Sequence, residues 1–239
     1  MIIIPARIGS SRFINKVLVD IGGMPMVIRT AKAVESIDRV VIATDSQEVM
    51  DIALKYKIEA IMTSSNHQSG TDRIYEAVQK LNLNSEEIVI NVQADEPFIE
   101  TDVVKAVYNI TKNNLSNDDI MMNSCYKTVS NPEADDPNIV KVVTDKNEFA
   151  LYFSRAKIPY PRDHQFKDYK GHLGIYGFSV KSLQKFCNLE SSSFENIEKL
   201  EQLRALDNGY KIAMVKVKTD SFGIDTVEDL QKALDYYNL

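Results

Sequence analysis

The stretch from Met1 to Lys16 reads MIIIPARIGSSRFINK. Its apolar start predicts a short buried strand, and a small, flexible, basic loop follows. In an open parallel α/β sheet, a loop at the carboxyl end of a central strand lies in the crevice where ligands bind. The glycine and serines at 9–11 let backbone N–H groups approach an anion closely, and Arg7, Arg12 and Lys16 add three positive charges. This chemistry suits a triphosphate; a strand followed by an ordinary solvated basic turn is the alternative.

Composition limits the class of protein. The chain has 239 residues, of which 44% are apolar and 26% charged, as in a soluble globular protein. This length suits one large α/β domain with a small elaboration, covering residues 1–239. No apolar run approaches the roughly 20 residues of a membrane span. The N-terminal run lacks a signal peptide's basic flank, so we expect a cytoplasmic protein with no membrane partner.

The net charge argues against one class of partner, nucleic acid, and the cysteine spacing argues against a cysteine metal site. The net charge of −6 makes general nucleic-acid binding a poor interpretation, so a polyanion site must be a local basic pocket. Cys125 and Cys187 are far apart and lack metal-ligand spacing, and we expect them to be reduced thiols.

Strands and helices alternate in the first half of the chain. Predicted strands cover residues 2–4, 40–43, 58–62 and 88–92, and predicted helices 46–56, 71–81 and 101–112. Such βαβ repetition predicts an α/β fold with a doubly wound, mostly parallel sheet and right-handed crossovers.

The pattern changes after about residue 117. Residues 139–145 and 173–180 predict strands of mixed pairing, and 154–172 form an irregular polar excursion. A helix is predicted over 193–208, where Ser192 and Glu195 make a capping box and Gly209 stops it. A strand over 211–217 and a last helix capped by Thr226 complete the chain.

Two acidic motifs follow predicted strands. Asp95 and Glu96 come directly after the strand at 88–92, where hard oxygen ligands suit Mg²⁺; a helix cap or loop charge is the alternative. Asp225 stands at the entrance of the last helix and either points into the crevice or is structural. Glu228 and Asp229 lie in that helix's first turn, where carboxylates favour the dipole, so we expect them to be structural.

The remaining polar motifs are less specific. The turn from His67 to Arg73 suits recognition of a base or ribose, or simply caps a helix. His172 has no partner at metal spacing, which favours a hydrogen-bonded histidine over a ligand. Arg155 and Arg162 flank the polar excursion, where they clamp a carboxylate or form surface ion pairs.

Together these motifs resemble the 3-deoxy-manno-octulosonate cytidylyltransferase (CMP-Kdo synthetase) family. The resemblance runs nearly end to end and rests on these segments: Ile4-Pro5-Ala6-Arg7 with Ser11-Arg12 and Lys16, Ala43-Thr44-Asp45, His67-Gln68-Ser69-Gly70-Thr71-Asp72-Arg73, Asn91-Val92-Gln93-Ala94-Asp95-Glu96-Pro97, Tyr152-Phe153-Ser154-Arg155-Ala156 with Ile158-Pro159, His172-Leu173-Gly174-Ile175-Tyr176-Gly177, Leu200-Glu201-Gln202-Leu203-Arg204 and Gly223-Ile224-Asp225-Thr226. The first is shared with many nucleotidyltransferases, and the ordered set is specific to this family.

The resemblance implies a reaction: CMP passes from CTP to the anomeric hydroxyl of 3-deoxy-D-manno-octulosonate (Kdo), pyrophosphate leaves, and the product serves lipopolysaccharide biosynthesis. It implies Mg²⁺ as cofactor and a homodimer whose interface includes 154–162. Residues 1–117 would mainly bind nucleotide, and 118–239 would bind sugar and dimerise.

The resemblance also implies site residues. The catalytic set is Arg7, Lys16, Asp95 and Asp225, the last two carrying magnesium. The nucleotide set is Ala6, Arg7, Arg12, Lys16, Ser69, Arg73 and Gln93. The sugar set is Arg155, Arg162, His172, Tyr176, Glu201 and Gln202.

Two departures and two alternatives bear on this interpretation. The family usually has Arg-Leu-Pro-Gly-Lys-Pro where this chain has residues 12–17, which should loosen the loop. Ala94 replaces a usual glycine and costs about 1 kcal/mol if its φ is positive. The alternatives are the same chemistry on another acidic sugar, such as a sialic acid or 8-amino-Kdo, and a non-catalytic nucleotide sensor.

Overall fold

A computed structural model describes residues 1–9, 13, 15–67, 69–163, 165–166 and 168–239. Within these residues, nine strands form one sheet. Its main path runs β3 (Glu59–Met62), β2 (Val40–Thr44), β1 (Ile2–Ala6), β4 (Ile88–Asn91), β8 (Tyr169–Ser179), β5 (Ile120–Val129) and β9 (Lys211–Lys216). Off this path, β6 (Lys141–Thr144) pairs with β8 and with β7 (Ala150–Ser154).

The sheet is mostly parallel, which confirms the predicted fold class. β1 runs parallel to β2 and β4, and β2 runs parallel to β3. β8 is antiparallel to both β4 and β5, whereas β5 and β9 are parallel. The antiparallel β8 therefore joins the doubly wound half to the mixed half.

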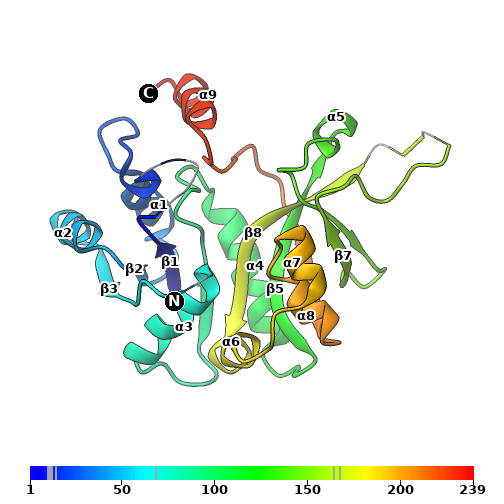
Figure 1. The fold of residues 1–239 in the computed structure, drawn as a ribbon, viewed down its shortest axis with the longest axis horizontal. Coiled ribbons are helices and arrows are strands. Elements are labelled where there is room, and N and C mark those ends of the chain that lie inside the picture. The colour runs from blue at the N-terminus through cyan, green and yellow to red at the C-terminus, as the bar shows by residue number, and fades with distance from the viewer. Residues whose placement is uncertain (10–12, 14, 68, 164, 167) are drawn as a thin grey trace.

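Helices cover both faces of this sheet (Figure 1). They are α1 (Met26–Val34), α2 (Gln47–Lys55), α3 (Gly70–Lys80), α4 (Thr101–Asn114), α5 (Asn131–Ala134), α6 (Val180–Cys187), α7 (Ser193–Glu198), α8 (Leu203–Asp207) and α9 (Val227–Tyr237), with a 3₁₀ turn, η1, at Lys16–Leu18.

Alternation along the strands explains why the two largest apolar clusters lie on opposite faces of the sheet. Ile2 and Ile4 of β1 pack in one cluster with residues of α1, α2 and α4. Ile3 points to the other face and packs with residues of α3 and α6. The hydrophobic run at the N-terminus thus has both faces buried, as a central parallel strand requires.

Three local expectations need correction. The helix predicted over 193–208 is broken, because Lys199 adopts a left-handed conformation with φ 55° and ends α7. The strand predicted from 173 begins earlier, at Tyr169, inside the supposed excursion. No element was expected over 120–129, which form the ten-residue strand β5.

Two parts project from the body in Figure 1: α9, which a long connection from β9 carries to the top of the view, and the segment between β7 and β8 at the right. None of the helices in the described residues is long and apolar enough to cross a bilayer.

Candidate active site

Three charged side chains from distant parts of the chain meet at the carboxyl edge of the sheet. Lys16 Nζ donates a hydrogen bond to Asp95 Oδ2 at 2.6 Å and another to Asp225 Oδ1 at 2.8 Å. Lys16 begins η1, Asp95 follows β4, and Asp225 precedes α9. The fold therefore gathers three of the predicted catalytic residues around one point.

The electrostatics of this cluster are strongly coupled. Burial alone would lower the pKa of Lys16, but Asp95 and Asp225 outweigh it and raise that pKa. Burial and then the Asp95 charge raise the pKa of Glu96 to about 8. Lys16 is therefore a permanent cation here, and Glu96 is mostly protonated at neutral pH.

One departure in the first loop, Asn15, has a structural explanation, and the concern about Ala94 is resolved. Asn15 has φ 53°, in the left-handed region, where asparagine is the best-tolerated residue after glycine. Ala94 is not among the residues of positive φ, so the strain considered for it does not arise. Arg7, which follows β1, is exposed and forms no ion pair with a described residue. Arg12 lies outside the described residues.

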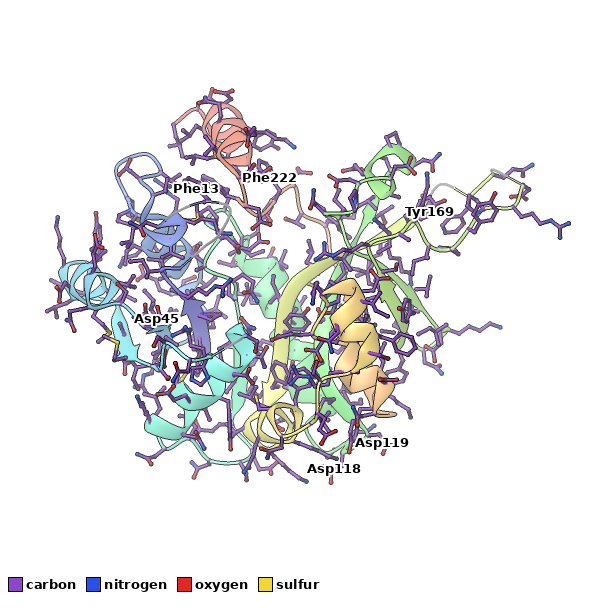
Figure 2. All side chains as sticks on the ribbon, viewed as in Figure 1. Phe13, Asp45, Asp118, Asp119, Tyr169 and Phe222 are labelled. Carbon is purple, nitrogen blue, oxygen red and sulfur yellow. The ribbon has the colours of Figure 1, made fainter. Side chains whose placement is uncertain are left out.

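The turn before α3 supports the first loop. Ser69 caps α3 by accepting the Asp72 N–H at 3.1 Å. Arg73 is buried and donates to Asp45 Oδ2 at 2.9 Å and to Thr63 Oγ1 at 2.6 Å. Asp45, which follows β2 (Figure 2), accepts the Ile8 N–H at 3.3 Å. Arg73 thus acts on the loop after β1 through Asp45.

Gln93 links the two halves of the sheet. Its Nε2 donates to Asn91 Oδ1 and to the Gly174 carbonyl of β8, both at 3.2 Å. A Cβ built on Gly70 would lie 3.9 Å from Gln93 Oε1. Gln93 therefore lies between β8 and the start of α3, close to Asp95 in the chain.

A second polar cluster lines β8 and the turn between α7 and α8. His172 Nε2 and Ser124 Oγ are 2.9 Å apart, and Tyr176 Oη donates to Gln202 Oε1 at 3.1 Å. A β-bulge between Ser124 and Cys125 shifts the β5–β8 register there, a device that re-aims side chains near functional sites. Burial lowers the pKa of His172 to about 3, so its ring is neutral.

Two buried polar atoms of this cluster have no partner in the described structure. They are Glu201 Oε1 and Gln202 Nε2. The other Glu201 oxygen accepts the Thr71 hydroxyl at 2.6 Å, and burial raises the pKa of Glu201. Unpaired buried polar groups are costly, so these atoms are suited to a ligand rich in hydroxyl groups.

The two arginines predicted to clamp a carboxylate lie in different surroundings. Arg155 donates from Nε to the Glu198 carbonyl at 2.8 Å and from Nη1 to the Pro137 carbonyl at 3.0 Å. These bonds tie it to the end of α7. Arg162 is exposed on the projecting segment between β7 and β8.

Sequence reasoning missed two contributors to the second cluster. Ser124 lies in the unpredicted strand β5, and no local signal marks it. Thr71 lies inside a quoted motif, but only the fold shows its bond to Glu201, 130 residues away.

The donor set at the first cluster fits Mg²⁺. Asp95 and Asp225 both reach one ammonium group, so their oxygens converge on a common point. Within the described residues no group of three or more metal-ligating side chains occurs. Mg²⁺ commonly takes one or two carboxylates plus substrate phosphates and water.

A basic loop after the first strand, convergent carboxylates and a buried polar cluster on one wound sheet are features of nucleotidyltransferases. The cytidylyltransferase family profile matches residues 1–212. A 3-deoxy-manno-octulosonate cytidylyltransferase from a Nitratiruptor species is 55% identical over 97% of both chains. One from Wolinella succinogenes is 50% identical over 99% of both.

A solved structure agrees with these relatives. It is described as CMP:2-keto-3-deoxy-manno-octonic acid synthetase complexed with CTP, and it matches with a TM-score of 0.90 at 36% identity. The match covers 100% of this chain and 98% of the other. The chain belongs to the 3-deoxy-manno-octulosonate cytidylyltransferase family and is a nucleotidyltransferase.

Proposed function

We propose that this enzyme transfers CMP from CTP to Kdo and releases pyrophosphate. The observation that carries the proposal is the convergence of Lys16, Asp95 and Asp225 at the sheet edge, near the Gln93 side chain that links this edge to β8. The relatives' names and the CTP-complexed neighbour support the same reaction.

The nucleotide half of the proposed site lies mainly in residues 1–117. The loop after Ala6 offers Arg7, Arg12 and Lys16 to the triphosphate. Ser69, Arg73 and Gln93 shape the cytidine side, Arg73 by holding Asp45 against the loop.

The sugar half lies in residues 118–239. Tyr176, Glu201 and Gln202 present a hydroxyl and the two unpaired atoms to the sugar, and neutral His172 completes that wall. Arg155 and Arg162 are assigned to the sugar's carboxylate. Arg155 is hydrogen-bonded to Glu198, at the end of α7, which precedes the turn that carries Glu201 and Gln202.

In the proposed reaction the sugar 2-hydroxyl attacks the α-phosphorus of CTP in line with the leaving pyrophosphate. Positioning and electrostatics provide most of the rate in such transfers. Lys16 and Arg7 stabilise negative charge that develops on the phosphates. Asp95 and Asp225 are the residues that would hold Mg²⁺, which when bound neutralises phosphate charge and acidifies the attacking hydroxyl.

We also propose a homodimer in the cytoplasm. Leu151, Tyr160, Phe166 and Ile197 are large apolar side chains left exposed on β7, α7 and the projecting segment, and a dimer interface there would bury them. Both cysteines are free thiols, as expected in a reducing compartment. Light scattering should give twice the 27.0 kDa chain mass; the monomer mass would contradict the dimer.

The test of the reaction is pyrophosphate release by the purified protein with CTP, Kdo and Mg²⁺. Parallel runs omit each component, replace CTP by UTP, and replace Kdo by 8-amino-Kdo. We expect release that needs all three components and prefers CTP and Kdo. CTP binding without release on either sugar would favour the nucleotide sensor instead.

The Asp225→Asn variant tests the site. It keeps the size of the side chain and removes its charge, so we expect a folded protein with turnover reduced at least about a hundredfold, the scale of one key electrostatic group. The measurement is the same release assay, with circular dichroism as the folding control. Turnover near that of the wild type would contradict the metal assignment.

A further inference from the structure

The carboxylate of Asp229, in the first turn of α9, does more than cap its helix. Its Oδ2 accepts the Thr226 N–H and the Thr226 hydroxyl, both at 3.0 Å. The Thr226 hydroxyl in turn accepts the Asp229 N–H at 3.1 Å. This reciprocal pair is a capping box, which explains why an acidic residue stands at this position.

One further bond is not part of a capping box. Asp229 Oδ2 also accepts the backbone N–H of Asp225 at 3.0 Å. Asp225 precedes the cap, and its side chain is 54% exposed, so little packing holds it. The bond from Asp229 restrains the peptide from which the Asp225 carboxylate projects toward Lys16.

The other side of Asp225 is tied to the Asp95 loop. Ile224 is buried and donates its N–H to the Asp95 carbonyl at 2.9 Å. A Cβ on Gly223 would lie 3.3 Å from Glu96 Oε1, so the two loops approach closely. Asp225 is therefore held on one side by the Asp95 loop and on the other by Asp229.

We propose that Asp229 is a positioning residue for divalent-cation binding, because it fixes the backbone that carries Asp225. The proposal rests on the metal role given to Asp225 in the proposed function. Two hydrogen bonds hold the backbone of Asp225 in place relative to Asp95: the one from the Ile224 N–H to the Asp95 carbonyl and the one from the Asp225 N–H to Asp229. Only the second can be removed by a side-chain substitution. Loss of such a supporting bond to a metal ligand typically weakens metal binding about 10–100-fold.

The test is direct binding of Mn²⁺, followed by electron paramagnetic resonance, with saturating CTP and no sugar. Asp229→Ala removes the acceptor, and we expect its Mn²⁺ dissociation constant to rise about 10–100-fold. Asp229→Asn keeps an acceptor oxygen and should retain most of the affinity. If Asp229→Ala does not fold, Asp229→Ser replaces it, because the shorter hydroxyl does not reach the Asp225 amide.

Two controls separate positioning from simpler roles. Glu228→Gln removes a charge from the same turn, where Glu228 is exposed. Thr226→Ala breaks the capping box but leaves the Asp229 bond to Asp225. We expect both to change the Mn²⁺ dissociation constant by less than about fivefold, the scale of an exposed charge.

The outcomes are distinct. Mn²⁺ affinity within about fivefold of the wild type in folded Asp229→Ala, or an equal loss in Thr226→Ala, would overturn the positioning role. Asp225→Asn is measured alongside: unchanged Mn²⁺ binding in that variant would instead refute the metal assignment on which the proposal rests. A loss in Asp225→Asn and Asp229→Ala alone supports both.

Discussion

At the scale of single residues, two glycines of β8 have opposite surroundings. A Cβ on Gly177 would lie 1.9 Å from Thr111 Oγ1 of α4, whereas one on Gly174 would have its nearest neighbour, Gln93 Cγ, at 3.9 Å. Gly177→Ala must therefore displace the Thr111 side chain, whose hydroxyl donates to the Val107 carbonyl, or shift β8 away from α4. We expect it to lower the free energy of unfolding by about 1–3 kcal/mol, the usual cost of overpacking, measured by urea denaturation.

Gly174→Ala is the matched control in the same strand, and its stability should stay close to that of the wild type. The double variant Gly177→Ala with Thr111→Ala removes the colliding atom and should recover part of the loss. Equal losses in the two single variants would show that the collision is not the cause.

His172 should make stability depend on acid pH. Burial lowers its pKa from 6.5 to about 3 in the folded protein. Below pH 6.5 His172 is therefore protonated in the unfolded chain but stays neutral in the folded protein, so the free energy of unfolding falls as the pH falls toward 3. Between pH 7 and pH 5 this one group should remove about 2 kcal/mol.

The comparison is with His172→Gln, which keeps a polar partner for Ser124 but does not titrate. Urea denaturation of both proteins at pH 7 and pH 5 isolates the histidine, because the remaining acidic and basic groups are shared. We expect the wild type to lose about 2 kcal/mol more than the variant. Parallel losses would show that His172 is protonated in the folded protein.

Several candidate site residues could be proposed one by one from the sequence, because their types suit the proposed chemistry and they follow predicted strands or precede a predicted helix. Lys16, Asp95 and Asp225 are of this kind. Their mutual bonds could not be predicted, since they span 79 and 209 residues. Asn15 shows the reverse case: the missing glycine was evident, but only its φ of 53° shows why asparagine replaces it.

At the scale of elements, the break between α7 and α8 matters most. Apolar residues recur from Ile197 to Leu206 with helical spacing, and neither glycine nor proline interrupts them. The sequence pattern therefore predicts one helix. The left-handed Lys199 ends it instead, and the turn that follows carries Glu201 and Gln202, the residues with unpaired buried atoms.

The last helix, α9, is attached to the loop that carries Asp95 by an aromatic pair. Phe98 and Tyr237 stack with ring centroids 3.7 Å apart, and Phe222 leads into the same helix (Figure 2). Such a pair contributes about 0.5–1.5 kcal/mol beyond burial. We expect Tyr237→Ala to speed amide hydrogen exchange in α9 by up to about tenfold, measured by mass spectrometry.

Tyr236→Ala is the control for that prediction. Tyr236 is 55% exposed, and its contacts with Phe222 and with Tyr237 are both edge-on, at 6.4 and 4.9 Å between centroids, rather than stacked. Its removal should change exchange in α9 less than removal of Tyr237. The same exchange rates in the two variants would mean that the stack does not hold the helix.

At the scale of the whole molecule, the doubly wound half could be predicted, apart from α1, because its βαβ units are local in sequence. The mixed half could be predicted only in part: strands were expected where β6, β8 and β9 lie, but β5 was not. The pairing of β5 with β8 joins segments some 50 residues apart, and polar Asn123 and Ser124 interrupt the apolar pattern of β5. The two halves meet where β4 pairs with β8. The Lys16 cluster lies on the β4 side of this junction and the Glu201 cluster on the β8 side, and Gln93 lies between them.

The two ion pairs of Lys16 lead to a last prediction. The Lys16 ammonium lies between Asp95 and Asp225, at 2.6 and 2.8 Å, and neutralises part of their charge. A unit charge about 4 Å away contributes roughly 1 kcal/mol even at the dielectric constant of water. Lys16→Met should therefore bind Mg²⁺ at least about fivefold more tightly in the absence of CTP, measured by isothermal titration calorimetry.

The same variant should turn over more slowly, because the phosphates lose a cation that stabilises their developing charge. Tighter Mg²⁺ binding together with slower turnover separates the two roles of Lys16, since a merely disordered site would lose both. Mg²⁺ binding that is unchanged or weaker in Lys16→Met would show that the lysine does not compete with the ion. In that case the main role of Lys16 at this site would be structural: its two ion pairs would hold Asp95 and Asp225 in position.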